Sequence, residues 1–307
     1  MKTLRKAAKT GSEHTLAAPD PGAAAPARID PAAPPTIVFA HANGFPAGSY
    51  RVLFDAWRAA GYRVCAVEKF GHDPRFPVTS NWPHLRDQLI ECIASDAGTP
   101  SFLVGHSLGG YLSLLAASRR PDLARGVLLL DSPILGGMVS QTMRFAKATG
   151  LVERFSPGHI SRRRREHWPS ADDAYAHFAA KPAFARWAPG VLRDYIACGV
   201  QRDDASIGEN AGHRLVFRRD VETRIYNTLP HHLTALLRRH PLRCLLAFIG
   251  GTHSTENRQV GLRTTRALTH GRMSFVEGSH LFPFERPEET TAQVLRWLEE
   301  FAAAPSA

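Results

Sequence analysis

The stretch that decides the fold reads FLVGHSLGGYLSLL, residues 102–115. Its first three residues are apolar, as in a buried strand, and the residues after the glycines have the composition of a helix. Between them lies Gly105-His106-Ser107-Leu108-Gly109, which fits the pattern G-x-S-x-G. Glycines at both flanks allow a tight strand-to-helix turn, because a side chain there would collide with neighbouring elements. We therefore expect the Ser107 hydroxyl to project from the edge of a sheet as a nucleophile, beside a helix N-terminus.

Strand and helix patterns alternate on both sides of this stretch. Before residue 136 we expect strands at 36–40, 62–67, 101–105 and 126–130 and helices at 49–60, 82–95 and 108–119. The alternation stops for about a hundred residues. It then resumes with strands at 244–249 and 272–276 and helices at 259–268 and 287–301. This order predicts an α/β fold with a mostly parallel, doubly wound sheet.

The interruption suggests how the chain is divided. Residues 136–240 contain helix-like segments and many aromatic residues, which predicts an inserted helical cap, or lid, over a core made of residues 36–135 and 241–303. We expect most of the aromatic residues to form the cap's own core. Residues 1–35 are rich in Ala and Pro and have no periodicity, so we expect a disordered tail.

Composition excludes several classes of protein. The chain has 307 residues, of which 44% are hydrophobic and 21% charged, as in ordinary globular proteins. The net charge is +10, and seventeen basic against ten acidic residues fall between 136 and 240. No nucleic-acid-binding signature accompanies them, so we expect a solvated, arginine-rich surface there, including the run Arg162 to Arg165. The longest apolar runs are far shorter than the ~18 residues of a membrane-spanning helix.

Cofactor and metal signatures are also missing from the sequence. No HExxH, no GxGxxG after a strand and no GxxxxGK[ST] occurs, so we expect neither a metal nor a cofactor. The cysteines are widely spaced and form no CxxC, which predicts reduced thiols in a cytoplasmic protein. They are Cys65, Cys92, Cys198 and Cys244.

A serine nucleophile needs a base, and His280 is the best placed of fifteen histidines. It follows the last expected strand and precedes the final helix, so it should lie at the same sheet edge as the serine. His72, His231 and His232 are its rivals. His106 is excluded as a base by its position inside the strand-to-helix turn, directly before Ser107.

These features resemble the α/β-hydrolase superfamily from about residue 36 to residue 301. The resemblance is carried by the stretches FAHANGFP (39–46), FGHD (70–73), GHSLG (105–109) and SHLFPFERP (279–287). It implies an oxyanion hole formed by the backbone N–H groups of Leu108 and Phe45. Because the first of these loops is longer than the usual His-Gly-x-Pro, Gly44 is the alternative second donor. Two such donors stabilise a developing oxyanion by a few kcal/mol each.

The acid of the implied catalytic triad departs from the commonest family pattern. Residues 250–256, after the first strand that follows the insert, read GGTHSTE and contain no aspartate. Some family members place the acid after the strand that follows the nucleophile helix, and Asp131 holds that position here. Asp131 is therefore the expected acid and Glu256 the alternative. The other interpretation of Asp131 is a residue that caps the turn at Ser132-Pro133.

By resemblance, this triad implies a cofactor-free serine hydrolase that acts through an acyl-enzyme on a small to medium ester or thioester. C–C bond hydrolysis, acyl transfer and perhydrolase chemistry use the same residues, because a fold does not fix the substrate. A protein of another class, a catalytically silent family member that binds a small ligand under its cap, is the competing hypothesis. In each case a small molecule is the expected partner.

Overall fold

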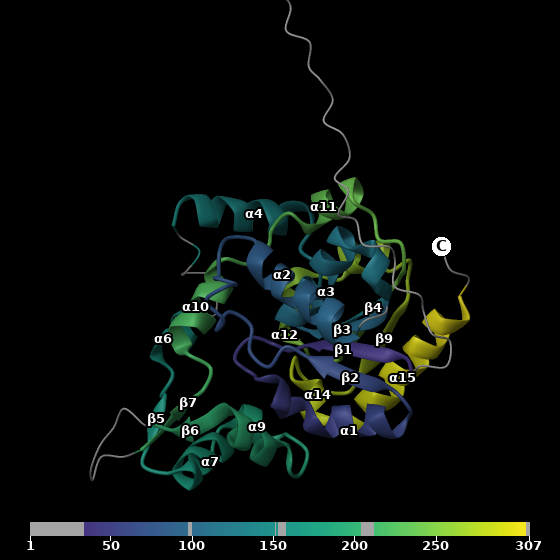
Figure 1. Ribbon diagram of the computed structural model, residues 1–307. Coiled ribbons are helices and arrows are strands. Elements are labelled where there is room, and N and C mark those ends of the chain that lie inside the picture. The colour runs from purple at the N-terminus through teal and green to yellow at the C-terminus, as the bar shows by residue number, and fades with distance from the viewer. Residues whose placement is uncertain (1–33, 98–99, 151, 153–157, 204–211, 305–307) are drawn as a thin grey trace, which may run out of the picture.

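The computed structural model describes residues 34–97, 100–150, 152, 158–203 and 212–304 (Figure 1). The expected disordered tail, residues 1–35, lies outside the described residues except for its last two positions.

A six-stranded parallel sheet forms the centre of the molecule. Its order is β2-β1-β3-β4-β8-β9, and every neighbouring pair is parallel. The strands are β1 (Thr36–Ala40), β2 (Arg63–Ala66), β3 (Ser101–His106), β4 (Ala124–Leu130), β8 (Leu245–Gly251) and β9 (Met273–Val276). Parallel strands must be linked by crossovers, which here are mainly helical. The predicted α/β fold with a doubly wound parallel sheet is confirmed.

Side chains of the central strands alternate between two hydrophobic cores, one on each face of the sheet. In β1, Ile37 and Phe39 belong to one core, whereas Val38 and Ala40 belong to the other. Because all four are fully buried, the strand is apolar throughout, as parallel strands covered on both faces are. This burial explains the continuous apolar runs that marked the strands in the sequence.

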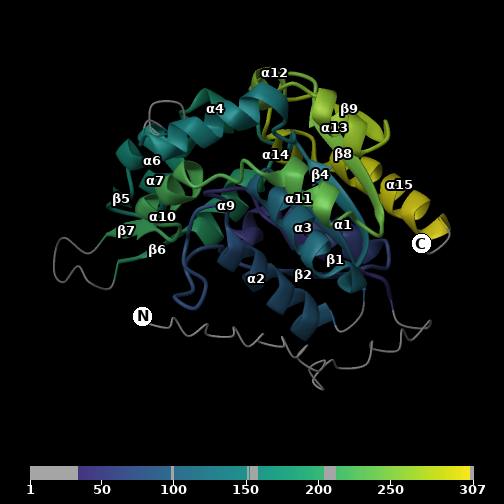
Figure 2. The ribbon, with the colours of Figure 1, turned by 90° about the horizontal axis from the view of Figure 1, so that it is seen from above.

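Helices cover both faces of this sheet (Figures 1 and 2). The helices α1 (Arg51–Ala59) and α15 (Pro287–Ala303) pack together on one face, and α2 (Pro83–Cys92) and α3 (Leu108–Arg119) on the other. The predicted helix at 259–268 is instead two short helices separated at Gly261, whose φ of 75° ends the first of them. The remaining elements of this part are η1 (Ala47–Tyr50), η2 (Ile93–Ala97), η3 (Pro121–Leu123), α12 (Thr255–Val260), α13 (Arg263–Leu268) and α14 (Phe282–Glu285).

The inserted segment, residues 136–240, is mainly helical but also contains a small antiparallel sheet of order β5-β7-β6. These strands have two or three residues each, too short for an alternating pattern to appear in the sequence. The elements are α4 (Gly137–Ala148), α6 (Gly158–Arg163), β5 (His167–Trp168), α7 (Ala171–Ala179), α8 (Pro182–Ala185), α9 (Val191–Gly199), β6 (Val200–Arg202), β7 (His213–Leu215), α10 (Arg219–Asn227) and α11 (Leu233–Arg239).

The inserted segment contributes to both hydrophobic cores. Tyr195 and Ile196 of α9 join the core beneath α1, and Val221 of α10 and Leu233 of α11 join the core beneath α3. Most of the aromatic residues that the structure describes in this segment are buried, although Phe145 is 65% and Tyr175 37% exposed. None of the helices in the described ranges combines the length and apolar character needed to cross a membrane.

Candidate active site

Ser107 occupies the turn between β3 and α3. Its backbone has a φ of 54° and a ψ of −112°, a conformation that residues with a side chain rarely adopt. Strain of this kind persists only where the surrounding structure enforces it, and it is concentrated at functional sites. The Ser107 N–H donates to the carbonyl oxygen of Leu130 over 3.0 Å, which ties the turn to the end of β4.

The glycines of this turn are required by close backbone contacts. A Cβ added to Gly105 would lie 2.3 Å from the backbone of Gly109, and one added to Gly109 would lie 1.8 Å from the carbonyl oxygen of Ala40. Both distances are far shorter than any non-bonded contact allows. The spacing G-x-S-x-G is thus dictated by the approach of α3 to β3 and β1.

The structure brings His280 and Asp131 together. The Nδ1 atom of His280 lies 2.7 Å from Oδ2 of Asp131, a distance typical of a charge-assisted hydrogen bond. Asp131 follows β4 with a φ of 44°, another left-handed backbone conformation that a non-glycine residue seldom adopts. His280 lies in the loop after β9, and its side chain is 19% exposed. Both side chains come from the sheet edge that carries Ser107.

Asp131 is fully buried, and its carboxylate is surrounded by donors from residues 251–257, which we call the loop after β8 and which include the last residue of β8 and the start of α12. Oδ1 accepts from the Gly251 N–H at 2.7 Å and from Nδ2 of Asn257 at 2.8 Å, while Oδ2 also accepts from the Ser254 hydroxyl at 2.5 Å. Burial by itself would raise the pKa of Asp131, but the hydrogen bonds, led by that from His280, hold the pKa below its ordinary value. The carboxylate therefore stays ionised in a site that excludes water.

The same interaction acts on the imidazole. Burial lowers the pKa of His280, but the hydrogen bond and the negative charge of Asp131 outweigh that effect and raise the pKa above its usual value. Because Nδ1 donates its proton to Asp131, Nε2 holds the basic lone pair of the neutral ring.

Glu256, the alternative acid, also lies near His280 but makes a weaker contact. Its Oε2 atom is 3.8 Å from Nδ1 of His280, and its side chain is 41% exposed. Asp131, Glu256 and His280 are close enough together to hold a metal ion. However, both Asp131 oxygens already accept hydrogen bonds from N–H or O–H donors, so this donor set fits a hydrogen-bonded acid better than a metal site.

A buried hydrogen-bond chain links the residue before the serine to the loop that carries the base. Ala42 N–H donates to the Tyr50 hydroxyl at 3.2 Å, that hydroxyl lies 2.7 Å from Nδ1 of His106, and Nε2 of His106 lies 2.9 Å from the carbonyl oxygen of His280. A carbonyl oxygen only accepts, so Nε2 of His106 donates and Nδ1 accepts from Tyr50. Burial, followed by the nearby His280, lowers the pKa of His106 to about 3, which keeps the ring neutral.

The two expected oxyanion donors come from different parts of the fold. Leu108 is the first residue of α3, where helix geometry leaves the N–H without an intrahelical partner. Phe45 lies in the loop after β1, and its N–H donates to the carbonyl oxygen of Ala42 over 3.2 Å. To donate to an oxyanion, the Phe45 N–H would have to share or give up its bond to Ala42. The Leu108 N–H would need no such change.

A buried ion pair from the inserted segment lies against the loop after β1. Nη2 of Arg164 is 3.1 Å from Oε2 of Glu222, and a Cβ on Gly44, whose φ is 85°, would lie 2.9 Å from Oε1 of Glu222. The amide of Asn43 donates to the backbone carbonyl of Glu222 over 3.0 Å. The expected exposed arginine run is therefore divided, because Arg164 points inward while Arg162, Arg163 and Arg165 are exposed.

The histidines that rival His280 as the base make their contacts elsewhere, and the Cys198 thiol is not activated. The Nε2 atom of His72 accepts from the Arg218 N–H, and His231 and His232 line a separate groove. Burial raises the pKa of the Cys198 thiol to about 11, so it stays protonated at neutral pH and is a poor nucleophile.

Sequence reasoning missed the residues that hold this site in place. Ser254 and Asn257, which donate to Asp131, lie at the N-cap and in the first turn of the short helix α12, in a polar stretch with no motif. Tyr50 and Glu222 lie in segments with an ordinary helical pattern, which does not mark them as residues of a site. The dipeptide Asn43-Gly44 is a turn signal and could have indicated a sharp bend after β1, but not its contact with Glu222.

Comparisons with known proteins identify related chains. The model of a family described as "Alpha/beta hydrolase family" matches residues 37–294. Monoglyceride lipase of Mus musculus is 29% identical over 132 residues, which cover 40% of this chain and 44% of that protein. A "Probable esterase" of Oryza sativa subsp. indica is 33% identical over 98 residues, which cover 31% of this chain and 37% of that protein. These matches span less than half of each relative's length.

Solved structures resemble the chain over most of its length. E-2-(acetamidomethylene)succinate hydrolase has a TM-score of 0.66 and 19% identity, with 86% of this chain and 91% of that chain covered. The thioesterase domain from the curacin biosynthetic pathway has a TM-score of 0.65 and 18% identity, with 85% and 91% covered. At this identity the likeness concerns the fold. The family match, over more than half of the sequence, shows that the chain belongs to the α/β hydrolase family.

Proposed function

We propose that this protein is a cofactor-free serine hydrolase that cleaves a small to medium ester or thioester through an acyl-enzyme. Ser107 is the nucleophile, His280 the base and Asp131 the acid. The hydrogen bond from His280 to the buried Asp131, at the sheet edge that carries the strained serine turn, is the observation that carries the proposal. Lipases and esterases among the relatives support the same class of reaction.

The proposed mechanism follows from the protonation states. Nε2 of His280 takes the proton of the Ser107 hydroxyl as its oxygen attacks the substrate carbonyl carbon. The imidazolium then gives that proton to the leaving alcohol or thiol, and the acyl group stays on Ser107. In the second half, His280 removes a proton from water as the water attacks the acyl carbonyl. The bond between the acyl group and the Ser107 oxygen then breaks, His280 returns the proton to that oxygen, and the acid is released. Asp131 fixes the imidazole tautomer and stabilises the transient positive charge without being protonated.

The developing oxyanion needs donors beside the serine. The Leu108 N–H at the start of α3 is one, and the Phe45 N–H is the proposed second. Since the Phe45 N–H donates to Ala42, we infer that the loop after β1 shifts slightly when substrate binds. The Arg164–Glu222 pair packs on this loop at Gly44, so the proposed cap, residues 136–240, is in direct contact with the oxyanion machinery.

Active-site labelling with a fluorophosphonate tests the proposal. We expect the wild-type protein to react at one serine and to hydrolyse a chromogenic ester. Ser107→Ala should lose both labelling and turnover, because its hydroxyl is the group that is acylated. Ser80→Ala, which changes an exposed serine, is the matched control and should behave like the wild type.

The outcomes also separate the competing functions. A folded wild-type protein that takes no label and cleaves neither esters nor thioesters would contradict the proposal and favour a silent ligand-binding protein. Labelling that Ser107→Ala retains would assign the nucleophile elsewhere. Labelling at Ser107 without hydrolysis of either substrate class would contradict ester and thioester cleavage and move the function to acyl transfer, perhydrolase or C–C bond chemistry.

A further inference from the structure

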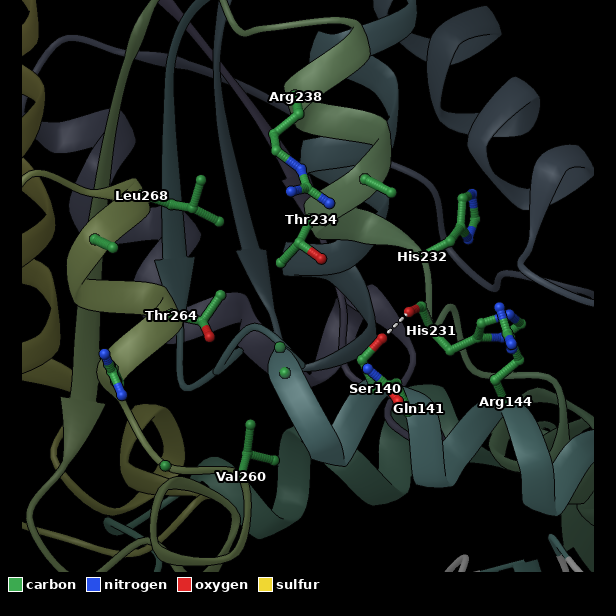
Figure 3. Close-up of a pocket in the computed structure, with 16 residues that line it drawn as sticks. Ser140, Gln141, Arg144, His231, His232, Thr234, Arg238, Val260, Thr264 and Leu268 are labelled. Atoms are coloured by element: carbon green, nitrogen blue, oxygen red, sulfur yellow. Dashed lines mark hydrogen bonds between the residues drawn. The ribbon is translucent and has the colours of Figure 1, made fainter.

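A large groove lies where the two ends of the inserted segment meet the core. It has a volume of about 880 Å³ and lies between α4, α11 and the α12–α13 region (Figure 3). None of Ser107, Asp131 and His280 lines it. The groove is therefore distinct from the candidate active site.

The groove is lined by positive and neutral residues only. Arg144 of α4, Arg238 of α11 and Arg263 of α13 line it, and no aspartate or glutamate does. Within the described parts of the chain, none of these three arginines has a carboxylate within ion-pair distance. By contrast, Arg120 and Arg218 each pair with an aspartate two positions later. A concave surface of one sign concentrates the electric field and attracts ions of the opposite sign.

Two histidines that line the groove add polar groups to it. The Ser140 hydroxyl donates to the backbone carbonyl of His231 (Figure 3). Outside the groove lining, Nζ of Lys147 lies 3.4 Å from Nδ1 of His231. Nδ1 of His232 is buried without a hydrogen-bond partner among the described residues. Burial and the charge of Lys147 lower the pKa of both histidines, so at neutral pH they offer hydrogen bonds rather than charge.

The size and walls of the groove indicate what kind of anion would fit. Val260, Leu268, Ala235 and Ala267 supply apolar surface between the arginines. A cavity of about 880 Å³ is in the range that holds an organic ligand rather than a bare inorganic ion. A phosphate monoester carries about −1.5 to −2 charges at pH 7 and matches the planar fork of arginine.

We propose that this groove binds an organic phosphate monoester, with the phosphate attracted by the unopposed positive charge of Arg144, Arg238 and Arg263 and the organic part against the apolar walls. Such a ligand would connect both ends of the inserted segment to the core. The proposal does not depend on the hydrolase function, because no residue of the candidate triad takes part.

Calorimetric titration at constant ionic strength tests this site with three probes, hexyl phosphate, adenosine monophosphate and inorganic phosphate. We expect at least one of the two monoesters to bind about tenfold more tightly than inorganic phosphate, because only they use the apolar walls. Preference for hexyl phosphate would indicate an alkyl body, and preference for adenosine monophosphate a nucleoside body.

Matched triple variants identify where the probe binds. Changing Arg144, Arg238 and Arg263 to Gln should weaken binding of the monoester at least about tenfold. The same charge change at the exposed Arg119, Arg193 and Arg202, which lie outside the groove, should alter binding less than about twofold. Circular dichroism confirms that both variants fold. No binding of either monoester, equal binding of inorganic phosphate, or equal weakening in the two triple variants would overturn the proposal.

Discussion

The loops that follow β4 and β8 lie side by side but carry opposite kinds of groups. The loop after β4 begins with the buried carboxylate of Asp131, which accepts hydrogen bonds only. The loop after β8 offers the Gly251 N–H, the Ser254 hydroxyl and the Asn257 amide, which all donate to that carboxylate. The parallel register pairs Leu130 with Ile249, which places the two loops in this position.

This difference shows that an acid and its supporting donors can come from different strands. The imidazole needs a carboxylate at a fixed place, and a buried carboxylate needs donors to offset its lost hydration. Here Asp131, directly after β4, supplies the carboxylate, and the loop after β8 supplies the donors. Glu256 belongs to that donor-rich loop but its side chain is 41% exposed, so water partly screens its charge.

The largest effect is expected from removing the charge of Asp131. Asp131→Asn should lower kcat by about three to four orders of magnitude, because the amide favours the wrong imidazole tautomer. Glu256→Gln is the matched control in the other loop and should lower kcat by less than about tenfold. Steady-state kinetics on one chromogenic ester gives both values. If the two variants ranked in the opposite order, the acid would belong to the loop after β8.

The chain from Tyr50 through His106 to His280 should have the next largest effect. His106→Phe removes both hydrogen bonds and should lower kcat about a hundredfold, since a displacement near 1 Å at the reacting atoms costs that much. His106→Gln keeps a donor for the His280 carbonyl oxygen and should recover much of the loss. Separate measurement of kcat and KM for both variants checks the positioning role. A change confined to KM would show that His106 does not position the base.

A smaller effect is expected from weakening the donors around Asp131. Ser254→Ala removes a hydrogen bond to the carboxylate and the N-cap of α12, so it should lower the free energy of unfolding by about 1–2 kcal/mol. Thr255→Ala, the neighbouring control, removes an exposed hydroxyl and should change it by less than about 0.5 kcal/mol. Urea unfolding measures both. Equal stabilities would mean that the loop does not support the acid.

The smallest effect is a shift in pH dependence. Neutral His280 is the proposed base, so kcat/KM should rise as pH passes the pKa of the free enzyme, which Asp131 holds above the ordinary value near 6.5. The charge of Glu256 also raises this pKa. Glu256→Gln should therefore move the rise to lower pH while leaving its upper plateau nearly unchanged. A shift to higher pH would show that Glu256 does not act on His280 through its charge.

Part of this arrangement could be predicted from the sequence because its signals are local. The turn at Ser107 is recognisable from its glycines, and Asp131 and His280 from their places at strand ends. The donors Ser254 and Asn257 could not be predicted, since their role depends on the register between β4 and β8. The Arg164–Glu222 pair joins segments 58 positions apart, and only tertiary packing distinguishes Arg164 from its exposed neighbours.

Proton NMR of the imidazole N–H groups tests most directly whether Asp131, rather than Glu256, orients His280. A proton on Nδ1 held in a short bond to a buried carboxylate resonates far downfield and exchanges slowly with water. We predict that the wild type and Glu256→Gln show this resonance and that Asp131→Asn loses it. A resonance that persists in Asp131→Asn and disappears in Glu256→Gln would contradict the assignment of the acid to β4.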